Sequence, residues 1–262
     1  KNFPWTMGFQ PNYQTMGKIF GGYVLKNHPN GKIGILYQND DYGKDYVIGL
    51  RAALGAKADA MIVAEETYEV TDPTVDSQIV NLKAAGADIF YNVAIPKFAA
   101  QAIKKIYDLG WKPVHLLNDV SNSVASVLKP AGLDKSQGIL STAYLKDPTD
   151  PSWADDAEFK DWQAFMAKYY PDGDKTNPFN GYGYAVASLM VHVLEKCGDD
   201  LSRANIMKQA ASVKDFRLKM ALPGINVNTG PEDFFPLEQA QMQVFKGEGW
   251  ERFGPLIAAD SL

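Results

Sequence analysis

Five β-rich apolar runs recur at nearly even spacing along the first half of the chain, and this spacing constrains the fold more than any other feature. The runs are Lys32–Tyr37, Ala60–Ala64, Asp88–Val93, Val114–Leu117 and Gly138–Tyr144. Consecutive runs begin about 24 to 28 residues apart, which is enough chain for one strand and one crossover helix. The alternation therefore predicts an α/β fold with a doubly wound parallel sheet.

The segments between these runs carry helix signals. Gly55 closes the first helical pattern, and Asp72 followed by Pro73 predicts the start of the second, because Asp is a good N-cap and proline suits the first turn. Pro96 opens the third pattern for the same reason. Each predicted strand is therefore followed by a helix of its own.

The second half of the chain breaks this pattern. The proline-rich connector Asp147–Pro151 leads into three helical segments, at about 154–169, 181–196 and 202–212, with no strand between them. Three successive helices need an apolar surface to cover, yet the five strands already have helices. The sequence therefore predicts a second lobe whose sheet is mostly absent from this chain. Short strands are expected in the tail, around 224–227 and 239–245.

Composition excludes several classes of function. The chain has 262 residues, a formal net charge of −5 and no basic run, which argues against nucleic-acid binding. No apolar stretch approaches the roughly 18 residues of a membrane span. The single cysteine, Cys197, allows no intrachain disulfide. Because the chain opens without Met or an apolar leader, it is expected to be a mature or trimmed product.

Three loops carry the residues from which a site could be built. In open α/β sheets, ligands bind at the carboxyl ends of the strands, and here those ends lead into loops 38–43, 94–97 and 118–123. Together the loops supply carboxylates, amides, hydroxyls and one aromatic ring. This mixture suits a small polar ligand with a positive or hydrogen-bonding head.

Each candidate in these loops also has a purely structural interpretation. Asp41 is well placed to cap a helix, and Tyr42 could serve only for packing. Asp119 could be the N-cap of a helix near 123–128. Phe179, between Pro178 and Asn180, could be a staple at a helix start.

The sequence shows no recognisable group of catalytic residues. The sequence holds three histidines and no nucleophile elbow, phosphate loop or dinucleotide fingerprint. His192 and Glu195 have a spacing that could hold a metal, but no third ligand is apparent. Cys197 is expected to be a small packing residue. The sequence thus predicts no enzyme, no metal site and no cofactor.

Three segments carry a resemblance to a known family. They are Ile35–Gly43, Val75–Asp88 and Gly181–Ala185, and their order and spacing match over nearly the whole chain, from Phe9 to about Trp250. On these segments the chain resembles the periplasmic branched-chain amino-acid (leucine/isoleucine/valine) binding proteins, the type I solute receptors of ABC importers.

The resemblance implies two α/β lobes joined by three crossovers. Residues 13–146 would form the second lobe, and residues 147–238 would be helices of an incomplete first lobe. Residues 239–262 would return to the second lobe as strands, and residues 1–12 would be a crossover. It also implies that roughly the first third of a family member, including the groups that bind an amino acid's carboxylate, lies outside this chain.

The resemblance further implies a set of ligand-binding residues. Tyr42 matches a second-lobe tyrosine that contacts ligand, Asp119 matches the acid that accepts the ligand ammonium, and Phe179 matches an aromatic pocket residue. Ile95 falls near the position of another ligand-binding tyrosine of the family, so it departs from the family pattern. Asp119 is shorter than the Glu that is usual in leucine-binding members. These two departures leave aliphatic amino acids, aromatic acids and small amides open as ligands. The full predicted set is Tyr42, Asp119, Phe179, Ile95, Ala94, Asn118 and Asp41.

The implied function is that of an extracytoplasmic solute receptor, periplasmic or extracellular, which closes on a small molecule and delivers it to the membrane permease of an ABC importer. A ligand-sensing domain of the same fold, in a receptor or an amide-type regulator, is the alternative. Neither function requires a cofactor.

Overall fold

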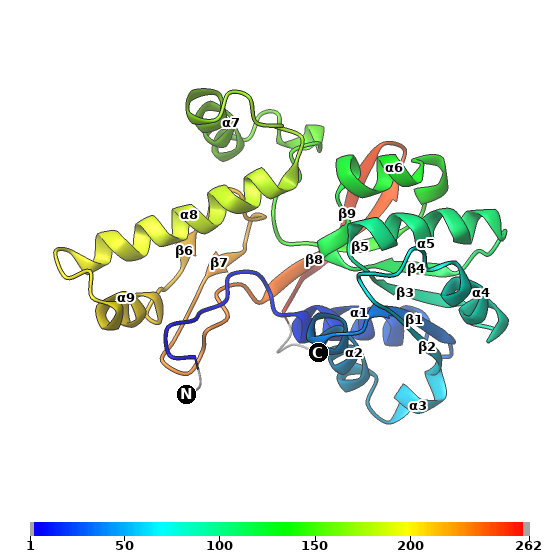
Figure 1. The fold of residues 1–262 in the computed structure, drawn as a ribbon. Helices are drawn as coiled ribbons and strands as arrows, with labels where there is room; N and C mark the ends of the chain where they lie inside the picture. The colour runs from blue at the N-terminus through cyan, green and yellow to red at the C-terminus, as the bar shows by residue number, and fades with distance from the viewer. Residues whose placement is uncertain (1–2, 259–262) are drawn as a thin grey trace. The chain divides into compact units, whose positions relative to one another are not determined.

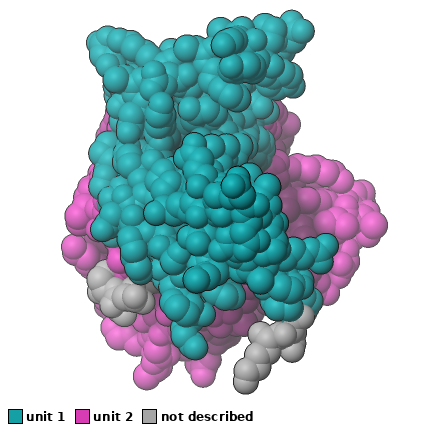
Figure 2. All heavy atoms as spheres, turned by 90° about the vertical axis from the view of Figure 1, so that its left-hand side faces the viewer, with its two compact units in different colours: residues 1–12, 144–239 teal, residues 13–143, 240–262 magenta. Residues whose placement is uncertain are grey.

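The computed structural model describes residues 3–258 and divides the chain into two compact units. Unit 1 comprises Lys1–Asn12 and Tyr144–Gln239, and unit 2 comprises Tyr13–Ala143 and Ala240–Leu262 (Figure 2). Each unit is therefore built from segments that are far apart in the sequence.

Unit 2 is built on a seven-stranded sheet in the order β2-β1-β3-β4-β5-β8-β9 (Figure 1). Strands β1 to β5 pair in parallel, and β8 pairs antiparallel with β5. The predicted doubly wound parallel sheet is thus confirmed, with an antiparallel addition at one edge. The strands are β1 Ile33–Gln38, β2 Ile62–Tyr68, β3 Ile89–Val93, β4 Val114–Leu117, β5 Leu140–Ala143, β8 Gln239–Lys246 and β9 Gly249–Ala258.

Helices cover both faces of this sheet. Helices α1 (Tyr13–Asn27) and α2 (Asp41–Leu54) lie on one face, and α4 (Asp76–Ala84) and α5 (Pro96–Asp108) lie on the other (Figure 1). Two short helices, α3 (Ala58–Met61) and α6 (Lys129–Ala131), complete the unit.

The predicted helix start at Asp72 is wrong. Helix α4 begins at Asp76, with Val75 at its N-cap. The Asp72 carboxylate instead accepts a hydrogen bond from the backbone N–H of Glu69 at 2.9 Å and closes a turn before the helix. Aspartate stabilises both kinds of structure through the same bond to a backbone N–H, so the sequence signal was ambiguous.

Successive side chains of a central strand point to opposite faces of the sheet, so one strand contributes to the apolar core on both faces. On β3, Phe90 faces the apolar cluster formed with α4 and α5, whereas Tyr91 packs against Phe20 of α1 with ring centroids 5.2 Å apart. Both side chains are fully buried. A strand covered on two faces is apolar at nearly every position, which explains the continuous apolar runs of the sequence.

Glycines bring α1 and α2 unusually close. A Cβ atom on Gly49 would lie 2.0 Å from the backbone oxygen of Gln14, and one on Gly17 would lie 2.3 Å from that of Tyr46. Neither position can hold a side chain without moving a helix. This close approach seats Tyr13 of α1 on Tyr46 of α2, with the rings stacked at 4.9 Å.

Unit 1 contains the three predicted helices and a small antiparallel sheet. Ser202 caps α9 by accepting a hydrogen bond from the backbone N–H of Asn205. The elements are α7 Ala157–Tyr169, α8 Pro178–Cys197, α9 Arg203–Ala210, β6 Phe216–Arg217 and β7 Asn226–Val227.

Candidate functional site

The loops predicted to carry the site lie at the carboxyl ends of β1, β3 and β4. In the order β2-β1-β3-β4-β5, the strand order reverses between β1 and β3. Open α/β sheets bind ligands at this reversal, because the two loops that leave it diverge to opposite faces. Six of the seven predicted site residues belong to these loops in unit 2.

Asp119 makes its principal contact with a tyrosine from a distant helix. It follows β4 at the start of a 3-10 turn, Asp119–Ser121, and its Oδ1 accepts a hydrogen bond from the hydroxyl of Tyr46. The alternative role as a helix cap is wrong, since Ser123 caps the following turn by accepting from the backbone N–H of Ser126. The Asp119 carboxylate is therefore left to interact at the carboxyl edge of the sheet.

Burial controls the ionisation of Asp119. It raises the pKa of this carboxyl from 3.8 to about 6, although the hydrogen bond from Tyr46 acts in the opposite direction. The carboxyl is thus largely ionised at neutral pH but poorly solvated. Such a group gains more than an exposed aspartate does from a cation that comes within hydrogen-bond distance.

Four tyrosine rings pack together beside the carboxylate, and we call Tyr13, Tyr42, Tyr46 and Tyr91 the tyrosine cluster. The Tyr42 ring lies edge-on to Tyr13 at 5.0 Å and to Tyr46 at 5.6 Å, and Tyr46 lies edge-on to Tyr91 at 6.3 Å. Burial raises the pKa of Tyr42, Tyr46 and Tyr91 well above 10, and the charge of Asp119 adds to this effect at all three. Their hydroxyls therefore stay protonated. Those of Tyr46 and Tyr42 donate hydrogen bonds to Asp119 and Asn118, whereas the buried hydroxyl of Tyr91 has no hydrogen-bond partner among the described residues.

Asn118 links the loops that bear Tyr42 and Asp119. Its Oδ1 accepts a hydrogen bond from the Tyr42 hydroxyl at 3.2 Å, and its Nδ2 donates to the backbone oxygens of Asn92 (3.0 Å) and Ala94 (2.9 Å). Asn118 and Ala94 are fully buried. In the described structure these two predicted site residues hold the loops in place.

Ile95 and Asp41 lie at the starts of two helices. Ile95 is the N-cap residue of α5, and its backbone N–H donates to the hydroxyl of Tyr68 at 2.9 Å. Asp41 is the exposed first residue of α2. The capping role considered for Asp41 belongs to its neighbour Asp40, whose carboxylate accepts from the backbone N–H of Gly43. Asp40 has the extended backbone that an N-cap requires, whereas Asp41 is already helical.

Phe179 lies in unit 1, at the second position of α8, and is 52% exposed. Its backbone N–H donates to the side chain of Asn177, which caps the helix. The ring itself is free to contact solvent or a ligand.

The sequence interpretation missed Tyr13, Tyr46 and Tyr91. Tyr46 stands four residues after Tyr42, and residues at that spacing share one face of a helix. This spacing could have identified it. Tyr13 and Tyr91 come from elements that precede or flank the loops, so only the tertiary structure shows that they join the cluster.

Other chemistry considered from the sequence has no support in the described residues. Within residues 3–258, no group of three or more His, Cys, Asp or Glu side chains could hold a metal ion. His192 stacks on Phe216 at 4.0 Å, and Cys197 is buried. In the same part of the chain, no helix is both long and apolar enough to cross a membrane.

Comparison with known proteins gives a consistent result. A family model described as "Periplasmic binding protein" matches residues 1–247. "Leu/Ile/Val-binding protein homolog 2" of Brucella abortus is 27% identical over 205 residues, which are 76% of this chain and 51% of the relative. "Leu/Ile/Val-binding protein homolog 3" of Brucella melitensis is 24% identical and covers 77% and 53%. The chain thus spans about half the length of the curated relatives it matches.

Solved structures show the same fold. A branched-chain amino acid ABC transporter protein from Thermus thermophilus with bound valine superposes with a TM-score of 0.81 at 14% identity, over 94% of this chain and 65% of that one. A substrate-binding periplasmic protein from Ralstonia solanacearum also gives 0.81, at 19% identity, over 95% and 69%. A leucine binding protein from Thermotoga maritima gives 0.74 at 16% identity, over 95% and 67%.

Proposed function

Because this chain belongs to the periplasmic binding protein family, we propose that it is part of a solute receptor of an ABC importer and that its ligand carries an ammonium group held by Asp119. The family and the matched relatives are substrate-binding proteins, which agrees with the expectation that the chain is not an enzyme. The family also implies an extracytoplasmic location, in the periplasm or outside the cell, and the membrane permease of an importer as the partner.

One observation carries this proposal: Asp119 presents a partly buried carboxylate beside tyrosine rings at the carboxyl edge of the sheet, one strand from the reversal point. A hydrogen bond between charged groups contributes roughly 1.5–3 kcal/mol net. A ligand ammonium would restore to Asp119 the solvation that burial removes. The rings of Tyr13 and Tyr42 would add apolar surface for the rest of the ligand.

The two-lobe organisation is part of the same proposal. Unit 2 would be one lobe, and the helices of unit 1 would belong to the other, whose remaining sheet lies in segments outside this chain. Closure of two lobes on the ligand is a hinge motion and requires no chemistry. In this arrangement Phe179 and Ile95 would help to select the ligand side chain.

Native mass spectrometry of the purified full-length protein is the first test. A small molecule that co-purifies and is released on denaturation would identify the ligand class. If the mass identifies a compound that has no ammonium group, such as a simple carboxylic acid, the proposed role of Asp119 is contradicted.

Substitution of Asp119 gives the second test. In the full-length protein we expect Asp119→Ala to weaken binding of the co-purified ligand, or of leucine or valine, at least tenfold by calorimetry. The matched control is Asp59→Ala, because the Asp59 side chain is 96% exposed and lies on another helix. Equal affinities of the wild-type and Asp119→Ala proteins would refute the ammonium assignment.

A further inference from the structure

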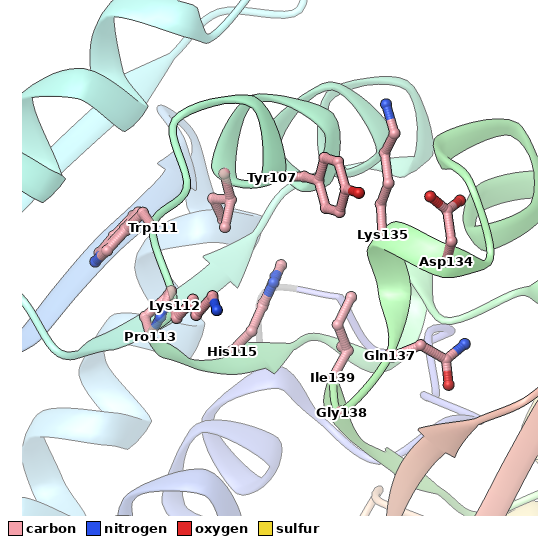
Figure 3. A pocket seen from close by; sticks show the side chains of 11 residues that line it. Tyr107, Trp111, Lys112, Pro113, His115, Asp134, Lys135, Gln137, Gly138 and Ile139 are labelled. Carbon is pink, nitrogen blue, oxygen red and sulfur yellow. The ribbon is translucent and has the colours of Figure 1, made fainter.

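A second cavity lies in unit 2 at the opposite end of β4 from Asp119. Its volume is about 330 Å³, which is within the range of small-molecule sites. It lies between the end of α5, the 3-10 turn Asp134–Ser136 and the first residues of β4 and the segment before β5 (Figure 3). His115 lines it. Asp119 is four residues further along the chain, or about 13 Å if those residues are extended.

His115 enters the cavity as a buried neutral imidazole. Its side chain reaches from β4 toward α5 in Figure 3 and is only 7% exposed. Burial lowers the pKa of His115 to about 3, so the ring carries no charge at neutral pH. Its Nε2 accepts a hydrogen bond from Nδ2 of Asn92 at 3.2 Å, which leaves the ring proton on Nδ1.

The Nδ1–H group has no hydrogen-bond partner among residues 3–258. Nδ1 of His115 is not one of the fully buried polar atoms that lack a partner, so this donor reaches the cavity and can be solvated there. The cavity that His115 lines is where an acceptor can enter. A ring donor of a buried side chain that lines the cavity gives an entering acceptor a defined place to bind.

Lys112 is the charged group of this cavity that favours an anion. Lys112 and Lys135 stand against one carboxylate, that of Asp134. Lys135 is engaged by Asp108 at 3.9 Å and by the ring of Tyr107 at 5.1 Å. Lys112 is exposed and makes no ion pair within the described residues, and Figure 3 shows it on the side of the cavity opposite Asp134.

The remaining walls are apolar. Ile106 and Ile139 are almost fully buried, and Trp111 and Pro113 add further apolar surface. The indole N–H of Trp111 is already bonded to the backbone oxygen of Ala87 at 3.1 Å. These walls suit the apolar body of a ligand and give no further specific polar contact.

We propose that this cavity is a second binding site, which takes a small monocarboxylate with an apolar body. The carboxylate would accept a hydrogen bond from Nδ1 of His115 and pair with the ammonium of Lys112. The apolar part would pack on Ile106, Ile139 and Pro113. The site shares no residue with the Asp119 site and does not depend on the function proposed above.

Benzoate is a suitable probe, and the three histidines provide the readout. We expect the side-chain imidazole NMR signals of His115 to shift saturably on titration with benzoate at neutral pH, while those of His28 and His192 stay unchanged. Benzamide has the same shape without the charge and should bind at least fivefold more weakly.

Substitution of Lys112 then tests the ion pair. Lys112→Gln should weaken benzoate binding at least fivefold, whereas Lys57→Gln, at an exposed lysine of another turn, should not change it. Lys112 is exposed, so its replacement is expected to leave the fold intact, and the unchanged His28 and His192 signals would verify this. The proposal is overturned if the His115 signals do not saturate, if benzamide binds as well as benzoate, or if Lys112→Gln has no effect.

Discussion

The hydroxyl of Tyr46 donates a hydrogen bond to the carboxylate of Asp119, although 73 residues separate the two in the sequence. Tyr46 is fully buried on α2, and Asp119 begins the turn after β4. The bond ties a helix on one face of the sheet to the loop in which the ligand is proposed to bind. A substitution at Tyr46 should therefore change the pKa of Asp119 even though Tyr46 is not proposed to contact the ligand.

Replacement of Tyr46 by Phe removes this donor and keeps the ring. We expect the pKa of Asp119 to rise further, because the lost hydrogen bond favours the ionised form. The free energy of unfolding at pH 7 should fall by about 1–3 kcal/mol, the usual cost of a buried polar group that loses its partner. A carboxyl-detected NMR titration and urea denaturation measure the two effects. The control is Tyr169→Phe, at a tyrosine that is 63% exposed. An unchanged Asp119 pKa in Tyr46→Phe would contradict this interpretation.

The contribution of Asp119 to stability should fall as the pH rises, which is opposite to the behaviour of an aspartate whose pKa is lowered by folding. The pKa of Asp119 is higher in the folded protein, about 6, than the ordinary value of 3.8. Between these values the folded state binds more protons, so the contribution of Asp119 falls as the pH rises through this window. The loss is at most roughly 3 kcal/mol at pH 7.

Comparison with Asp119→Asn isolates this effect from other titrating groups. The variant has no charge to desolvate and can still accept the hydrogen bond from Tyr46. Relative to the wild type, it should be more stable at pH 7 than at pH 4.5 by about 1–3 kcal/mol in urea denaturation. A stability difference that is the same at both pH values would show that Asp119 titrates normally.

Two helical glycines should respond oppositely to substitution by alanine. At Gly49 the new methyl group would lie 2.0 Å from the backbone oxygen of Gln14, so Gly49→Ala should force α1 and α2 apart and cost about 1–3 kcal/mol of unfolding free energy. At Gly183 no atom lies within 4 Å, and Gly183→Ala should stabilise the protein by up to about 1 kcal/mol. Thermal unfolding of both variants measures the contrast. Similar effects at the two sites would mean that the close contact of α1 and α2 does not exist in solution.

Exposed apolar side chains on α8 should make residues 1–262 self-associate. Met190, Val191 and Leu194 are 50%, 53% and 36% exposed and lie on neighbouring turns. Exposed apolar side chains that adjoin one another on a helix favour association with another apolar surface. Sedimentation velocity should show less association for the double variant Val191→Glu, Leu194→Glu than for the wild type. Val70→Glu, at a valine that is 55% exposed in unit 2, should have no effect. Equal association of the double variant and the wild type would show that this face is not responsible.

The sequence predicted the strands of unit 2 best where burial makes every position of a strand apolar. Strand β3 is buried on both faces, so it reads as a continuous apolar run and its bounds were close to correct. Strand β2 lies at the edge of the sheet, and its side chains alternate between exposed and partly buried. Because Glu65 and Glu66 interrupt its apolar pattern, the predicted run 60–64 ended early and covered only the beginning of β2.

The site was predictable only in part, for a related reason. Tyr42 and Asp119 were predicted because each follows an apolar strand, and the carboxyl ends of such strands meet at one edge of the sheet. The tyrosines of the cluster come from α1, α2 and β3, and the contact of Tyr13 with Tyr46 depends on the packing of α1 against α2. No local pattern in the sequence encodes that packing, so the tyrosine cluster emerged only from the folded structure.

The last strands of the sheet have a consequence for how the protein folds during synthesis. Strand β5 pairs with β8 through Leu140 and Val244, and the indole N–H of Trp250 donates to the backbone oxygen of Asn122 at 2.8 Å across 128 residues. The larger part of unit 1, from Tyr144 onward, is translated between β5 and β8. The edge of β5 therefore stays unpaired while the ribosome makes about 100 further residues, and exposed strand edges promote aggregation. A chaperone that shields this edge until β8 emerges would raise the yield of folded protein more than one that acts after release.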